Sequence, residues 1–78
     1  MRIGNLGVCT SMNINNPGVA YPVALVLVKP GCDPISYALD SEEELIDFKK
    51  RRKFTTDSQT GQKKTDQGWF FIGYYLPH

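Results

Sequence analysis

Two segments of this chain are apolar at successive positions rather than at every second one. Residues 23–28 read VALVLV, and residues 69–76 read WFFIGYYL. Successive side chains of a strand point to opposite faces of a sheet, so both segments would carry apolar side chains on both faces. A small sheet with one solvated face would alternate apolar and polar residues instead. The sequence therefore predicts a sheet that needs cover on both sides.

Turn signals place further strands before and after the first apolar segment. A strand is predicted over residues 3–14, and the turn Asn15-Asn16-Pro17-Gly18 then leads to a strand over residues 20–29. Two strands separated by such a turn predict a hairpin. A short third strand is expected over residues 35–39, directly before a helix.

The helix carries signals at both ends. Ser41 followed by Glu44 is a capping box, and acids at the start with bases at the end suit the helix dipole. The helix is expected over residues 41–53. Its apolar stripe is narrow and consists of Leu45 and Phe48, flanked by Ile46.

The remaining segments complete a β-β-β-α-β order. Residues 55–68 form a polar connection that contains either a short hairpin around Thr60-Gly61 or a mobile loop. The last strand is expected over residues 69–76. We therefore predict an α+β fold: a small antiparallel sheet with one helix packed on one face, as a single domain over residues 1–78.

One helix with three apolar side chains can cover one face of this sheet at most. The second face then needs a second copy of the chain in a homodimer, a different protein, or stacked bases. A curled sheet with residues 54–67 folded over it is the self-contained alternative. Small domains gain little stability from a single core, and this favours association.

The sequence offers few candidate residues for catalysis or for metal binding. The chain has one histidine, His78, and the carboxylates at Asp40 and 42–44 sit where helix-start acids normally serve the dipole. Cys9 and Cys32 do not form a Cys-x-x-Cys pair; they are expected as reduced, partly buried thiols, with a disulfide between them as the alternative. We therefore expect no enzyme activity, no cofactor and no metal.

No secretory signal or membrane-spanning run is recognisable. The longest apolar run is residues 23–28, far short of the roughly 20 residues that a spanning helix needs. The expected location is cytoplasmic, without a membrane partner.

Two groups of residues are candidates for partner binding. The basic group forms a run at the helix end and a pair in the following connection, and it is either a solvated helix end or a surface for phosphates or an acidic partner. The aromatic group lies on the last strand and supplies side chains typical of interface anchors. The candidates are Lys49, Lys50, Arg51, Arg52, Lys53, Lys63 and Lys64, and Trp69, Phe71, Tyr74 and Tyr75.

The segment 68–74 resembles the aromatic strand of the RNA-recognition motif, on which that family stacks bases. The order of elements differs, because in that family a helix follows the first strand and here a turn does. The chain is therefore not assigned to the family, although stacking of bases on this strand stays an alternative.

These observations favour a non-enzymatic interaction protein. Its expected partner is a protein with an acidic or apolar surface, bound by an aromatic sheet face with a basic rim, and a homodimer is expected as well. In type the chain resembles small phage or mobile-element inhibitors of host machinery, such as anti-CRISPR proteins, although no motif carries that likeness. The alternative is a nucleic-acid-binding protein that uses the basic helix end and the aromatic strand.

Overall fold

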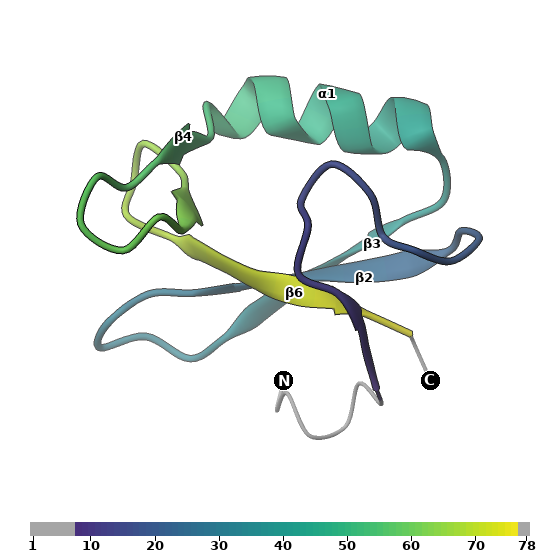
Figure 1. The fold of residues 1–78 in the computed structure, drawn as a ribbon, viewed down its shortest axis with the longest axis horizontal. Helices are drawn as coiled ribbons and strands as arrows, with labels where there is room; N and C mark the ends of the chain where they lie inside the picture. The colour runs from purple at the N-terminus through teal and green to yellow at the C-terminus, as the bar shows by residue number, and fades with distance from the viewer. Residues whose placement is uncertain (1–7, 77–78) are drawn as a thin grey trace.

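A helix lies across one face of an antiparallel sheet in this protein (Figure 1). The structure, a computed structural model, describes residues 8–76. Within that range the strands follow the order β3-β2-β6-β5-β4, β1 also pairs with β6, and all pairings are antiparallel. The predicted α+β fold is therefore confirmed. The elements are β1 (Cys9–Ser11), β2 (Val23–Val28), β3 (Ile35–Leu39), α1 (Glu42–Arg52), β4 (Thr55–Thr56), β5 (Lys63–Lys64) and β6 (Phe70–Tyr75).

The predicted hairpin between the first two strands is wrong. β1 is only three residues long and pairs with β6, where Cys9 faces Tyr75. The asparagines before β2 explain the difference, because Asn13 and Asn16 accept hydrogen bonds from backbone N–H groups two residues further on and so form a wide loop. Residues 3–7 of the predicted strand lie outside the described residues.

The other connections follow their turn residues. β2 and β3 form a hairpin with an unbroken register from Val23 opposite Leu39 to Leu27 opposite Ile35. Gly31 in its turn has a φ of +81°, which glycine adopts without a steric penalty. Between residues 55 and 68 the chain forms the β4–β5 hairpin, so the hairpin alternative is confirmed for this segment.

The hydrophobic core lies between the sheet and α1. Leu45 is buried and Phe48 packs against the core as predicted, but Ile46, expected beside them as a third apolar side chain over the sheet, is 43% exposed and lies outside the core cluster. The wide loop before β2 also contributes, since Ile14 is buried there. The buried cluster consists of Ile14, Val23, Leu25, Leu27, Leu39, Leu45, Phe71 and Tyr74.

A bulge in β6 breaks the simple alternation expected for that strand. Val26 pairs with Gly73 and Leu27 pairs with Phe71, so Ile72 is an extra residue that has no paired residue on β2. Phe71 and Tyr74 consequently lie on the same side, with ring centroids 5.0 Å apart. Regular alternation along the predicted strand would place these two residues on opposite faces, and the bulge removes that alternation.

The sheet face turned away from the core is less open than the sequence predicts. Val26, on that side of β2, is 0% exposed within the single chain, and Ala24 is also buried. The segment that could have folded over this face instead extends the sheet as β4 and β5, and its Phe54 packs near Phe48 of α1 at 5.9 Å between centroids.

We expect Gly73→Ala to lower the free energy of unfolding by about 2–4 kcal/mol. A Cβ at this position would lie 2.8 Å from the Cys9 Sγ, and the φ of +155° is strained for any L side chain. Gly31→Ala is the matched control, because its φ is also positive but no atom lies within 4 Å of the added Cβ. Urea unfolding measures both variants, and equal losses would show that the approach of β1 to β6 is not tight.

We expect Tyr74→Phe to lower the free energy of unfolding by about 1–3 kcal/mol at neutral pH, because the buried Tyr74 hydroxyl donates to the Ile14 carbonyl. Burial, and secondly Tyr21, raise the pKa of Tyr74 above its ordinary value. The unfolded chain therefore loses this proton first, and stability falls as the pH rises above about 10. Denaturant unfolding at increasing pH should show a shallower fall for Tyr74→Phe than for the wild type. Parallel curves would contradict the assignment.

Candidate functional site

Helix α1 is fixed at both ends by its own sequence. The Ser41 hydroxyl accepts a hydrogen bond from the Glu44 N–H at 3.2 Å, and the Glu44 carboxylate accepts one from the Asp40 N–H. At the other end Lys53 adopts a left-handed conformation, and its N–H donates to the Lys49 carbonyl at 3.1 Å. The capping signals thus set the orientation in which the helix presents its charged residues.

The basic run does not form one surface. Successive helical residues are rotated by about 100° from one another, so neighbouring bases point in different directions. Lys49 donates to the Asn15 side chain at 2.9 Å, Arg51 forms an ion pair with Asp47 at 2.8 Å, and Arg52 donates to the Tyr37 hydroxyl at 2.9 Å. Lys50 and Lys53 are exposed.

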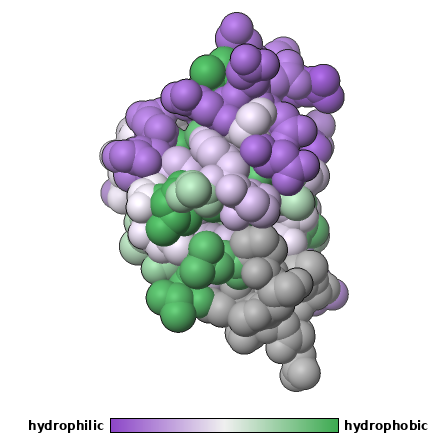
Figure 2. All heavy atoms as spheres, turned by 90° about the vertical axis from the view of Figure 1, so that its right-hand side faces the viewer, coloured by the Kyte–Doolittle hydropathy of each residue, from purple (hydrophilic) through white to green (hydrophobic). Residues whose placement is uncertain are grey.

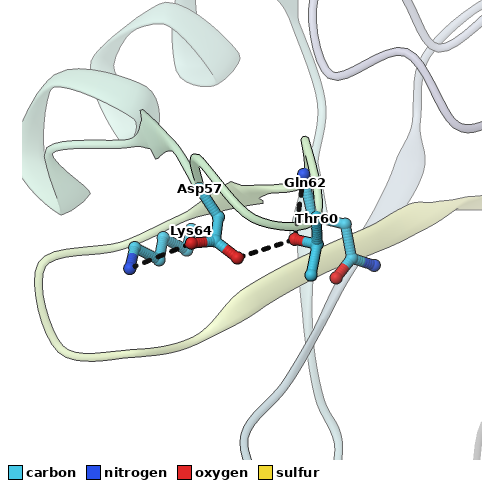
Figure 3. A network of polar contacts seen from close by, with 4 residues as sticks. All are labelled: Asp57, Thr60, Gln62 and Lys64. Atoms are coloured by element: carbon cyan, nitrogen blue, oxygen red, sulfur yellow. Dashed lines mark hydrogen bonds and ion pairs between the residues drawn. The ribbon is translucent and has the colours of Figure 1, made fainter.

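The second basic pair, Lys63 and Lys64, supports the β4–β5 hairpin. Lys64 lies 3.7 Å from the Asp57 carboxylate, and Lys63 donates to the Thr56 hydroxyl. Figure 3 shows Asp57 between Lys64 and the Thr60 hydroxyl, which donates to it at 2.8 Å. That hydrogen bond is the main cause that lowers the pKa of Asp57. These lysines are thus bound within their own hairpin.

The four aromatic candidates do not come together on the surface. Phe71 and Tyr74 are buried in the core, so they stabilise the fold and are not accessible to a partner. Trp69 is half-buried against the core, with Lys29 Nζ 5.8 Å from the ring centroid. Tyr75 is half-buried next to Cys9; burial, then Cys9, raises the pKa of its hydroxyl.

A hollow of about 330 Å³ lies instead between α1 and β3. Helix residues at positions 44, 47, 48, 51 and 52 line it, and this i, i+3, i+4, i+7, i+8 spacing is one face of a helix. This spacing is visible in the sequence. Because four of the five residues are charged, however, a search for an apolar helix face does not find them. The lining residues are Tyr37, Ala38, Leu39, Glu44, Asp47, Phe48, Arg51 and Arg52.

The outer edge of β3 borders this hollow. Among residues 8–76 no strand pairs with that edge, since β3 is the last strand of the order. β3 reads ISYAL and has no charge, proline or bulge, the devices that usually protect an exposed edge. By contrast, β4 and β5 have two residues each, and β1 has three with an irregular register.

The rest of the described surface has fewer features of a binding site. Hydrophilic residues cover the upper part of one side, where α1 lies, while hydrophobic residues reach the surface lower down (Figure 2). A second hollow of about 290 Å³ lies between the loop at residues 12–15 and the β4–β5 turn, and among the described residues that line it Lys63 alone is charged.

The cysteines are free thiols, and both residues are exposed rather than partly buried as expected. Among the described residues, no group of three or more His, Cys, Asp or Glu side chains is placed to hold a metal ion. Nor does the described part of the chain contain a helix long and apolar enough to span a membrane.

Comparisons of the chain with protein-family models, with curated proteins and with solved structures find no match.

We expect Arg52→Lys to lower the free energy of unfolding by about 1 kcal/mol. The Arg52 guanidinium lies 5.1 Å from the Tyr37 ring centroid and 5.4 Å from that of Phe48, so it joins the helix to β3 at the rim of the hollow. A lysine keeps the charge but cannot stack its head group in the same way. Lys50→Arg is the control at an exposed position, and thermal unfolding compares the two. An unchanged Arg52→Lys protein would show that the stacking contributes nothing.

Proposed function

We propose that this protein is a non-enzymatic binding module that takes an extended segment of a partner protein against β3, beside α1. The observation that carries the proposal is the uncharged edge of β3 next to the hollow, with which no strand among residues 8–76 pairs. An added strand gains affinity from main-chain hydrogen bonds, while its alternate side chains enter neighbouring pockets.

The chemistry of the hollow suits a polypeptide. Tyr37, Leu39 and Phe48 supply apolar surface, and the helix contributes carboxylates and guanidinium groups to the same lining. Both signs of charge lie within one hollow, so it matches a peptide with mixed side chains better than a uniformly negative phosphate backbone.

This proposal moves the docking surface from the aromatic strand to the β3 edge. The buried positions of Phe71 and Tyr74 are the reason for the change. Inhibition of host machinery by a small phage or mobile-element protein is one role that such a surface would serve. Nucleic-acid binding has weaker support, because most of the candidate bases contact groups of their own chain.

A selection from random displayed peptides tests the module directly. We expect enriched peptides to shift the backbone amide signals of residues 35–39, and to bind at least about tenfold more weakly to Ala38→Lys, since an inserted edge lysine opposes strand addition. Ser58→Lys adds the same charge on an exposed turn and should bind like the wild type. Signals that shift along β1 or β6 instead, or peptides insensitive to Ala38→Lys, would refute the β3 site.

A parallel titration with a labelled duplex and a labelled single strand checks the nucleic-acid alternative. We expect no binding at moderate salt. Affinity that falls steeply with salt and is lost when Lys49, Lys50 and Lys53 are replaced together would favour that alternative over the peptide module.

A further inference from the structure

We infer that the partner segment is β3 of a second copy of this chain. The two copies would meet edge to edge about a twofold axis and form one continuous antiparallel sheet. The inference rests on the proposed function and names the partner at the same site.

The charges on α1 follow an order along the helix. The helix residues that line the hollow form a stripe with acids, Glu44 and Asp47, toward its start and bases, Arg51 and Arg52, toward its end; Phe48 lies between them. We call this set the charged stripe. In a twofold dimer the two helices run antiparallel, so the acidic half of each stripe faces the basic half of the other. The charged stripe is therefore complementary to itself.

β3 is suited to pair with β3 of a second copy. Paired antiparallel about Tyr37, the strand places Ile35 opposite Leu39 of the second copy and brings no two charges together. Its register with β2 is regular along all five residues, so the edge is not twisted away by a bulge. A formal net charge of +1 also means that two copies repel each other little.

The charged stripe also discriminates among partners. A strongly acidic segment would be repelled by Glu44 and Asp47, and a strongly basic segment would be repelled by Arg51 and Arg52. Either segment would therefore face like charges along half of the charged stripe. A second copy presents both signs in the order that the stripe requires. Charge complementarity thus favours the chain itself over a foreign acidic or basic partner.

The oligomeric state is the first measurement. Sedimentation of the full chain over a range of concentrations should give about twice 8.8 kDa at the upper end. Ala38→Lys should sediment as a monomer, while Ser58→Lys should remain a dimer. Circular dichroism of each variant confirms that it is folded. A wild-type monomer throughout the range would overturn the inference.

A charge exchange tests the contact itself. Asp47 and Arg51 are suited to it because their side chains are 56% and 77% exposed, so either can be reversed with little effect on the monomer. In the dimer each Asp47 lies toward Arg51 of the other copy. Asp47→Lys and Arg51→Glu should therefore each raise the dimer dissociation constant about tenfold or more at low ionic strength.

Mixing the two variants should restore dimers as a heterodimer, because both contacts then join opposite charges. The double variant Asp47→Lys/Arg51→Glu should also regain the dimer. Both charges are then reversed in each copy, so position 47 of one copy again faces an opposite charge at position 51 of the other. Recovery in both cases supports the inference. Failure of both, or a dimer that is indifferent to Ala38→Lys, would place the contact elsewhere and overturn it.

The inference and the proposed function fail in different ways. If the wild type is a monomer but selected peptides bind at residues 35–39, the second copy is not the partner and the binding module stands. If neither peptides nor a second copy bind at β3, both are wrong.

Discussion

The bulge at Ile72 in β6 is the feature on which the rest of the fold depends. It brings Phe71 and Tyr74 to the same side of a single strand, beneath α1, where a regular strand would place them on opposite faces. Tyr74 then reaches the Ile14 carbonyl and holds the wide loop before β2 against the core. Gly73, next to the bulge, leaves the space in which Cys9 approaches β6. One extra residue thus determines the core, the loop and the place of β1.

The elements themselves were largely predictable, because each has a local cause. Ser41 and Glu44 begin the helix, the turn at Gly31 joins two strands, and the VALVLV run is a central strand. Local signals did not determine which strands pair with one another. The asparagine-rich segment predicted a tight hairpin, but the side chains of Asn13 and Asn16 accept hydrogen bonds from backbone N–H groups two residues further on, and the segment forms a wide loop. Partner choice by β1 is a long-range property that depends on the edge offered by β6.

The candidate site was predictable only in part. The sequence predicts interface anchors among the aromatic residues of β6. Whether an aromatic side chain packs in a core or lies at an interface depends on its face of the strand, and the bulge places Phe71 and Tyr74 together in the core. The basic run is continuous in sequence but does not lie on one surface, because consecutive residues diverge around a helix. The more informative grouping is 44, 47, 48, 51 and 52, which mixes charges and so is not recognised by a search for residues of one kind.

The order of charges on α1 has two consequences that follow from one physical cause. Acids near the start and bases near the end stabilise any helix through its dipole, and the same order makes any such helix complementary to an antiparallel copy of itself. Charge order alone is therefore common and identifies no interface. In this chain it becomes informative because the charged stripe lies beside a strand edge that has neither a lysine nor a proline to protect it. The adjacency of the two features, rather than either one, is the reason why we propose β3 as the place where a partner binds.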